Sequence, residues 1–246
     1  MIRKRIHIIT FLIILLLIGC QRTPTSPDPE NDVTLSLVFD TRHPTQHALV
    51  TRVMGNNEFG NLYINEAVLS TGESTFNNVE KQVSLLDKRE YALHSDFNYS
   101  AGMLVRPGSN YEVHLQTEET TITGTTTVPD TLGVQFNTED QLITWHDDEN
   151  TAMYIVNIYA VRSFGNLEPV STNNVVFDTL YQVSDDEWSL FSHFSFEVIA
   201  FDRNYYQHAV QGKNQVGISG GRGVVASIHS ERYRYWPPHT GPLGRN

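Results

Sequence analysis

Apolar and polar residues alternate along most of the chain after residue 32. The cleanest case is the stretch 111–117, where Tyr111, Val113 and Leu115 alternate with Glu112, His114 and Gln116. A period of two predicts a β-strand with one buried face and one exposed face. No window between residues 33 and 128 has the spacing of an amphipathic helix over three turns. We expect strands at 33–39, 62–64, 79–86, 101–105, 111–117, 120–128, 134–136, 142–145, 153–161, 175–180, 194–201, 224–229 and 232–236.

The spacing of these short strands, with Gly, Asn and Asp in the turns, is typical of an all-β protein. The pair Pro129-Asp130 interrupts the pattern and marks a boundary. We therefore predict two antiparallel β-sandwich domains, one over residues 33–128 and one over residues 129–236. Residues 237–246, rich in proline and glycine, are expected to form a flexible tail.

Aromatic residues in the second predicted domain carry a resemblance to a known family. Trp145 lies on an early strand, Tyr154 begins the next, and Phe196 lies on a later one. This arrangement resembles a fibronectin type III domain, a member of the wider group of immunoglobulin-like sandwiches. The resemblance covers residues 129–236 and implies that these three aromatic side chains pack between the two sheets.

The N-terminus has the features of an export signal. Basic residues 3–5 precede an apolar run, residues 8–18, that is far shorter than the ~20 residues of a membrane-spanning helix. The run ends in Leu17-Ile18-Gly19-Cys20, which resembles the lipobox of bacterial lipoproteins. The resemblance implies that residues 1–19 are removed as a signal peptide and that Cys20 is acylated. The alternatives are an ordinary signal peptide with a chance cysteine and an uncleaved anchor.

The segment that follows Cys20 has the composition of a tether. Residues 20–32 contain three prolines and, after the cysteine, no aliphatic or aromatic residue, which predicts an extended and disordered linker. Gln21 stands where some bacteria place an aspartate that retains lipoproteins at the inner membrane. We therefore expect a lipid-anchored protein of the cell envelope, located at the outer membrane.

Charge and cysteine content narrow the possible partners. Cys20 is the only cysteine, so no disulfide is expected. Removal of residues 1–19 takes three of the 17 basic residues, and 14 then remain against 28 acidic ones, a net charge of about −14. Such a surface argues against nucleic acid as a partner. Membrane lipid, reached through acylated Cys20, is the predicted partner.

The mature chain also has a second family resemblance. The lipobox and tether, the strand 111–115, the sequence from Ile122 to Pro129 and the glycine-rich approach to the last strand resemble a family of uncharacterised lipoproteins. These are often encoded beside outer-membrane nutrient receptors. The resemblance informs location and fold and brings no catalytic residues. The leading interpretation is a non-catalytic binding or assembly module, accessory to an outer-membrane complex.

A serine hydrolase is the remote alternative. Gly217-Ile218-Ser219-Gly220-Gly221 matches G-x-S-x-G, and His47, Asp96 and Ser219 follow the chain order of chymotrypsin-like proteases. However, a nucleophile elbow requires a helix after the serine, and the residues after Gly221 read as a strand. We expect a glycine-rich loop there and no enzyme.

Metal and cofactor sites are not predicted. Pro44 rules out a helical pair of His43 and His47, and the other histidines are scattered. The acidic stretches 146–150 and 184–187 could offer oxygen ligands to Ca²⁺ but lack the spacing of a calcium loop. We expect polar turns at both places.

Aromatic residues near strand ends provide an alternative function. We single out Trp188, Tyr205, Tyr206 and Trp236 as candidate binding residues, because exposed aromatic rings stack on sugars and anchor protein partners. If they form one exposed platform, the protein is a glycan-binding lipoprotein; if they are mostly buried, they belong to the core.

Overall fold

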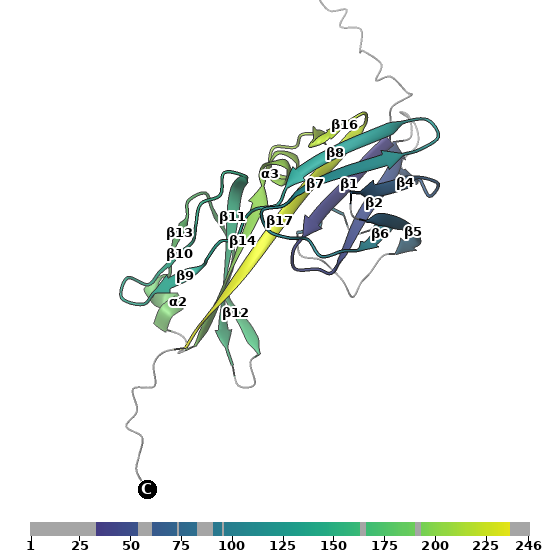
Figure 1. Cartoon of the computed structure of the whole chain (residues 1–246). Coiled ribbons are helices and arrows are strands. Elements are labelled where there is room, and N and C mark those ends of the chain that lie inside the picture. The colour runs from purple at the N-terminus through teal and green to yellow at the C-terminus, as the bar shows by residue number, and fades with distance from the viewer. Residues whose placement is uncertain are drawn as a thin grey trace, which may run out of the picture.

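The computed structural model describes residues 33–53, 61–72, 74–82, 91–94, 96–162, 166–189 and 193–236. The chain folds into two all-β halves arranged along one long axis (Figure 1). The predicted fold class, an all-β sandwich protein, is confirmed. Cys20 and the predicted signal peptide, tether and tail lie outside the described residues. Among the described residues, no helix is both long and apolar enough to cross a membrane.

The N-terminal half is one strongly curved sheet that folds over on itself. Its strands follow the order β1-β2-β6-β5-β4-β7-β8-β16, with β3 paired to β2. The strands are β1 (Val33–Asp40), β2 (Thr45–Val53), β3 (Asn61–Tyr63), β4 (Val68–Thr71), β5 (Thr75–Gln82), β6 (Phe97–Gly102), β7 (Asn110–Gln116), β8 (Thr121–Thr127) and β16 (Ile218–Ser219).

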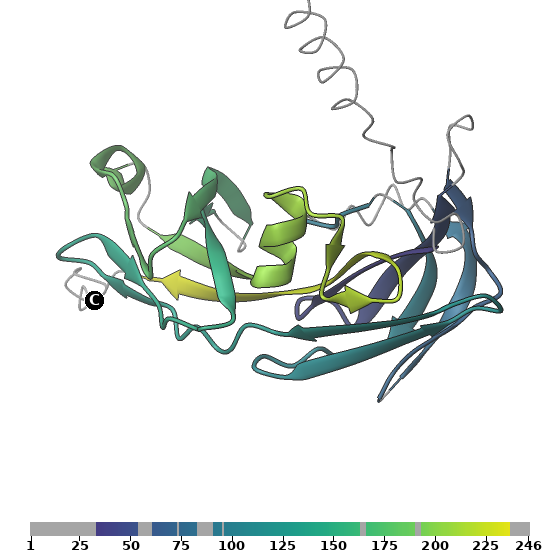
Figure 2. The same cartoon turned by 90° about the horizontal axis from the view of Figure 1, so that it is seen from above.

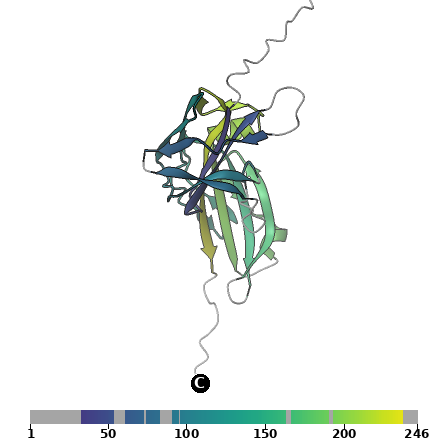
Figure 3. The same cartoon turned by 90° about the vertical axis from the view of Figure 1, so that its right-hand side faces the viewer.

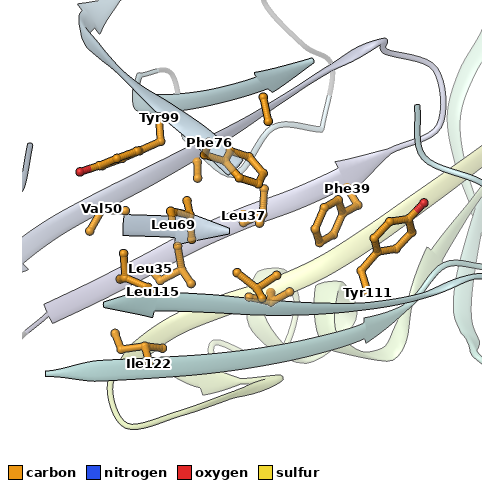
Figure 4. Close-up of a cluster of buried hydrophobic side chains, with 14 of the residues drawn as sticks. Leu35, Leu37, Phe39, Val50, Leu69, Phe76, Tyr99, Tyr111, Leu115 and Ile122 are labelled. Carbon is orange, nitrogen blue, oxygen red and sulfur yellow. The ribbon is translucent and has the colours of Figure 1, made fainter. Parts of the chain in front are cut away.

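Apolar side chains fill the interior of this curved sheet. Leu35 from β1, Leu115 from β7 and Ile122 from β8 are fully buried and point into the same interior (Figure 4). The ring of Phe39 stacks on that of Tyr111, with 4.7 Å between their centroids. The curvature therefore gives this half a closed apolar core.

The C-terminal half is a sandwich of two sheets. The three-stranded sheet has the order β13-β10-β9, and the sheet facing it has the order β12-β11-β14-β17. The elements are β9 (Gln135–Asn137), β10 (Leu142–Thr144), β11 (Thr151–Val161), β12 (Leu167–Val176), β13 (Leu180–Gln182), α2 (Asp185–Ser189), β14 (Phe194–Asp202), α3 (Arg203–Ala209), β15 (Gln215–Val216) and β17 (Arg222–Tyr235). Trp145, Tyr154 and Phe196 are buried between the sheets, as predicted.

One strand, β17, belongs to both halves. Its first part pairs in parallel with β1, from Arg222 opposite Thr34 to Ile228 opposite Asp40. Its second part pairs antiparallel with β14, ending at Tyr235 opposite Phe194. Figure 3 shows this strand, coloured yellow, passing from one half into the other. The backbone hydrogen bonds of a single strand thus connect the two halves. The predicted boundary at residues 128 and 129 falls between β8 and β9.

Close approach of β17 to β1 requires a glycine. Gly223 has φ +109°, and a Cβ atom there would lie 2.0 Å from the carbonyl oxygen of Leu35. A side chain is excluded by both the backbone conformation and the neighbouring strand. Gly223, the second residue of β17, therefore has a structural reason.

Several strand predictions need correction. The predicted strand 175–180 is wrong, because β12 ends at Val176, residues 177–179 form a bend, and β13 begins at Leu180. The predicted strands 224–229 and 232–236 are one continuous strand, β17. β6 lies four residues earlier than predicted at its start and three at its end. β5 begins four residues before the predicted strand 79–86, and β12 was predicted only at its last two residues. β2, β4, β15, β16, α2 and α3 were not predicted at all.

Candidate functional site

A polar groove lies at the seam, the region where the two halves meet. Its volume is about 670 Å³, within the range of ligand sites in proteins. Residues from β7 and β8 in the N-terminal half form one wall, and residues from the C-terminal half form the other. The lining residues are Asn110, Tyr111, Glu112, Thr125, Thr126, Thr127, Glu149, Asn150, Asp202, Arg203 and Asn204.

The first wall is the outward face of the β7–β8 hairpin. Asn110 pairs with Thr127, and Glu112 pairs with Thr125, in adjacent rows of the two strands. The intervening residues, such as Tyr111, point into the core, so this face carries polar side chains alone. In Figure 2, β7 and β8 form one side of the N-terminal half, and the chain then continues along the molecule toward β9. Strand alternation thus places the polar groups on the groove.

The second wall is fixed by hydrogen bonds that cross the seam. The side-chain amide of Asn204 donates to the carbonyl oxygens of Thr125, at 3.0 Å, and Val225, at 2.9 Å. The guanidinium of Arg203 donates to the carbonyl oxygen of Glu149 at 2.9 Å. These contacts hold the start of α3 against β8, β17 and the β10–β11 turn. Side-chain hydrogen bonds to backbone carbonyl oxygens therefore fix the second wall relative to the first.

A buried carboxylate lies at the bottom of the groove. Asp202 caps α3 by accepting from the backbone N–H of Tyr205 at 2.7 Å. It also accepts from the hydroxyl of Thr126, and the hydroxyl of Ser227 lies 3.2 Å from its Oδ2. Burial raises the pKa of Asp202 from 3.8 to about 6, and the hydrogen bonds offset part of that rise. Asp202 thus joins β8, β17 and α3 in one polar contact.

A second hollow adjoins the groove. Its volume is about 480 Å³, and it shares the residues Asn110, Tyr111 and Glu112 with the groove. Its remaining lining comes from Thr71, Gly72, Arg106 and Ser109. The two hollows together extend along the surface from the β4–β5 turn to α3.

Two further sets of hydrogen bonds lie near the seam. The carboxylate of Glu231 on β17 accepts from the backbone N–H groups of Leu132, at 2.7 Å, and Gly133, at 2.9 Å, in the segment between the halves. On another side of β17, the hydroxyl of Tyr205 donates to the carbonyl oxygen of Tyr91, at 3.0 Å, and the Tyr91 hydroxyl donates to Asn173 at 2.9 Å. The Tyr205–Tyr91 contact thus ties the two halves together, and the Glu231 contacts hold residues 132–133 against β17 within the C-terminal half.

The structure does not gather the four predicted aromatic residues into one platform. Trp188 is half-buried and stacks on Phe194, with 5.1 Å between centroids. Tyr205 is buried in the seam, and half-buried Tyr206 packs against the same cluster. Trp236 is exposed and contacts the ring of His193. These residues lie in three separate places, and none lines the groove.

Ser219 lies apart from the two residues proposed with it. It is exposed and pairs with Thr123 at the edge of β8. The ring of His47 stacks on Phe97, and Asp96 accepts from the hydroxyl of Tyr63. Within the part of the chain that the structure describes, no hydrogen bond joins Ser219 to a histidine or a carboxylate. A nearby glycine, Gly217, is required by packing, because a Cβ there would lie 2.7 Å from the carbonyl oxygen of Val225.

Hydrogen bonds within the acidic stretches account for their composition. In the stretch 146–150, Asp148 accepts from the backbone N–H groups of Asp130 and Asn150 and so stabilises the turn before β11. In the stretch 184–187, Ser184 and Glu187 exchange hydrogen bonds as a capping box for α2. The described residues include no group of three histidine, cysteine or acidic side chains that could hold a metal ion.

No protein-family model and no curated protein sequence matches this chain.

The groove was not predicted from the sequence. Alternation did place Glu112 on the exposed face of its strand, and Glu149 and Asn150 belonged to a predicted polar turn. The sequence does not indicate that these residues line the same groove as Asp202, Arg203 and Asn204, because that depends on the path of the chain through β14 and α3. The sequence signals that bear on the groove are the alternating polar residues of β7 and β8 and the helix-capping residue Asp202.

Proposed function

We propose that this chain is a non-catalytic, lipid-anchored lipoprotein of the cell envelope that acts as a binding or assembly module. We further propose that it is an accessory to an outer-membrane complex. The observation that carries the binding role is the polar groove at the seam, because both halves contribute its walls and hydrogen bonds fix them. Prearranged polar groups in a concave site are what a binding site requires.

The direction of the strands supports an anchored role. Val33, the first described residue, starts β1 beside the start of β17, and β17 ends at the opposite end of the molecule (Figure 1). At ~3.3 Å per residue, the 14 residues of β17 extend roughly 45 Å. A lipid anchor at Cys20 would therefore hold the N-terminal half nearer the membrane and present the C-terminal half away from it.

The groove favours binding over chemistry. Asp202 is the buried titratable group at its bottom, and this carboxylate already bonds to Thr126 and to the backbone of Tyr205. Ser219, the one nucleophile that the sequence singled out, does not line the groove. The side chains that remain accessible on the walls are hydrogen-bonding and charged groups suited to recognition.

Membrane anchoring is tested by the Cys20→Ala variant. Because the diacylglyceryl group of a lipoprotein attaches to the thiol of that residue, we expect the variant to leave the membrane fraction or to remain as unprocessed precursor. Fractionation followed by mass spectrometry of the N-terminus measures both. Ser219→Ala is the matched control and should remain acylated and in the membrane. Unchanged processing and membrane association of Cys20→Ala would contradict the lipoprotein assignment.

The binding role is tested by affinity capture of the acylated protein from detergent-extracted membranes. We expect one outer-membrane protein to be recovered in stoichiometric amount, and mass spectrometry would identify it. Recovery of no protein, together with hydrolysis of a generic ester substrate that Ser219→Ala abolishes, would replace the proposal with an enzymatic one.

A further inference from the structure

We propose that the outer face of the C-terminal half binds a carboxylate-bearing segment of a partner protein. The outer face is the side of β11, β14 and β17 that points away from the three-stranded sheet, close to the end of β17. It is separate from the groove and is therefore a second binding surface. That its partner is a protein rests on the assembly role proposed above.

Strand alternation brings residues of three strands together on this face. Tyr233 and Tyr235 pack against the apolar cluster between the sheets, so Arg234 between them points to the other side. Arg234 is opposite Ser195 on β14, and Ser195 is opposite Tyr159 on β11. Tyr159, Ser195 and Arg234 thus form one row across the outer face.

The neighbouring row is a polar cluster whose groups bond to one another. Glu197 is buried, and its carboxylate accepts from the Arg232 guanidinium at 2.9 Å. The carboxylate also accepts from the hydroxyl of Tyr159 and the side-chain amide of Asn157, both at 3.3 Å. The Arg232 guanidinium lies 5.7 Å from the centre of the Tyr159 ring, within the range of a cation–π contact. These contacts hold Arg232 and Tyr159 in place beside Arg234.

Arg234 is the cation on this face that lacks a partner. Its side chain is exposed, and no hydrogen bond or ion pair joins its guanidinium to another residue in the part of the chain that the structure describes. Ser195, directly opposite, is fully buried, and its hydroxyl has no hydrogen-bond partner among the same residues. A buried hydroxyl without a partner costs free energy. A carboxylate bound by Arg234 would lie beside Ser195 and would accept hydrogen bonds from both side chains.

Exposed cations exceed exposed anions on this face. The side chain of Arg232 is 41% exposed and that of its partner Glu197 only 8%, and Arg234 adds a second exposed cation. At the adjoining end of β11, Arg162 is paired with Glu168, so this pair adds no net charge. Charges more than about 8 Å away are largely screened at physiological salt. A ligand on this face therefore meets a local positive excess, although the whole chain has a formal charge of −11.

An exposed aromatic ring lies next to this positive excess. Trp236 is 56% exposed, and its ring contacts that of His193, which precedes β14, with 4.8 Å between centroids. Tryptophan, tyrosine and arginine are the residue types that most often provide the binding energy of protein interfaces. Arginine also binds a carboxylate through two parallel hydrogen bonds. A protein segment offers carboxylates and apolar side chains together, which suits this face better than a wholly polar acidic glycan.

The position of the face suits contact with a partner. Val33 starts β1 beside the start of β17, whereas Trp236 follows the far end of β17 (Figure 1). A lipid anchor at Cys20 would therefore leave the outer face accessible at the end of the molecule away from the membrane.

The test uses the full-length acylated protein in detergent micelles and two fluorescent decapeptides. One peptide alternates glutamate and alanine, the other glutamine and alanine, and fluorescence anisotropy measures the dissociation constant of each. The variants are Arg234→Gln and Trp236→Ala, both at exposed side chains. Lys213→Gln is the control for charge, at an exposed position in the loop before β15. Phe177→Ala is the control for the ring, since Phe177 is 67% exposed and lies beside α3.

We expect the glutamate peptide to bind at least about tenfold more tightly than the glutamine peptide. Because the chain as a whole is acidic, such a preference requires a local cationic surface. Arg234→Gln should weaken binding of the glutamate peptide about tenfold or more, and Lys213→Gln about twofold or less. Trp236→Ala should weaken it about fivefold, whereas Phe177→Ala should leave it unchanged.

Three results would overturn the proposal. The first is equal binding of the two peptides to the wild-type protein. The second is an equal loss of affinity in Arg234→Gln and Lys213→Gln. The third is tighter, Arg234-dependent binding of an acidic oligosaccharide, hexagalacturonate, which would assign the face to a glycan.

Failure of this inference can be told apart from failure of the proposed function. If affinity capture recovers an outer-membrane protein and Arg234→Gln recovers it equally well, the assembly role stands and the assignment of this face is wrong. If capture recovers no protein but the glutamate peptide binds through Arg234, the face is supported and the proposed outer-membrane complex is wrong.

Discussion

The interior of the N-terminal half and the seam are held together by different kinds of contact. Inside the N-terminal half, the cluster around Leu35, Leu115 and Phe39 consists of apolar residues from strands of a single curved sheet (Figure 4). At the seam, an apolar cluster that includes Phe201 lies beside a buried polar contact of Asp202. The seam therefore combines burial with hydrogen bonds of defined direction.

The two kinds of contact have different roles: the apolar core stabilises the N-terminal half, and the hydrogen bonds of the seam set the position of one half relative to the other. Apolar burial is nondirectional, so the N-terminal core stabilises its half without fixing the position of the other half. The hydrogen bonds of Asp202, Asn204 and Tyr205 each require a partner from the N-terminal half. Because an unmade buried hydrogen bond is costly, these contacts specify one arrangement of the halves. The groove depends on that arrangement.

The largest expected effect is in the N-terminal core. Phe39→Ala should lower the free energy of unfolding by about 3–5 kcal/mol, because it removes a fully buried ring that stacks on Tyr111 and leaves a cavity. Urea denaturation followed by far-ultraviolet circular dichroism measures this change. Leu104→Ala, at a side chain that is 71% exposed, is the control and should change stability by less than about 0.5 kcal/mol. Similar values for the two variants would contradict the assigned core.

The next effect concerns pH and the seam. The folded-state pKa of Asp202 is about 6, above the unfolded value of 3.8, so the folded protein binds this proton more tightly. Stability from this group is fully present below pH 3.8 and is lost as the pH rises through about 6, by about 3 kcal/mol in total. Asp202→Asn should remove this pH dependence and keep the helix cap, since asparagine also caps helices.

Denaturant titrations at several pH values between 4 and 7 measure the Asp202 effect. The wild-type stability should fall relative to that of Asp202→Asn over this range. Glu139→Gln, at an exposed position, serves as the control and should follow the wild type. Parallel pH profiles for wild type and Asp202→Asn would contradict the buried position of this carboxylate.

The smallest expected effect is at the edge of the seam. Tyr91→Phe removes the hydroxyl that donates to Asn173 but keeps the ring packed at 5.2 Å from that of Phe201. Because the hydrogen bond is exposed, we expect a loss of about 0.5–1 kcal/mol, measured by urea denaturation. Tyr91→Ala also removes the ring and should cost more. Equal costs for the two variants would mean that the ring contributes nothing to the seam.

Sequence pattern predicted the fold best where one strand face is buried and the other is exposed. β7 is such a strand, and its inward and outward residues agree with the alternation of Tyr111, Glu112 and Val113. β2 escaped prediction because polar residues occupy buried positions in it: Gln46, for example, is fully buried and bonds to the backbone of Asp40. In β2, buried hydrogen bonds satisfy a polar side chain at an inward position, so the strand lacks the alternation of apolar and polar residues.

The shared strand and the groove could not be predicted for a related reason. β17 changes its neighbours at Ile228, and the burial pattern changes with it, so one strand read as two. The groove needs the β7–β8 hairpin and the start of α3 together, although 90 residues separate Glu112 from Asp202 in the sequence. Local propensity contains no information on such a contact. Trp188 and Tyr205 were similarly placed near strand ends, but their packing is decided by distant elements.

We infer that β17 and the polar contacts of the seam join the two halves into one cooperative unit that carries the groove. Differential scanning calorimetry of the acylated protein in detergent tests it most directly. We predict a single transition whose calorimetric enthalpy equals its van't Hoff enthalpy. Two resolved transitions, one for each half, would contradict the claim, because the two walls of the groove would then belong to separately unfolding bodies.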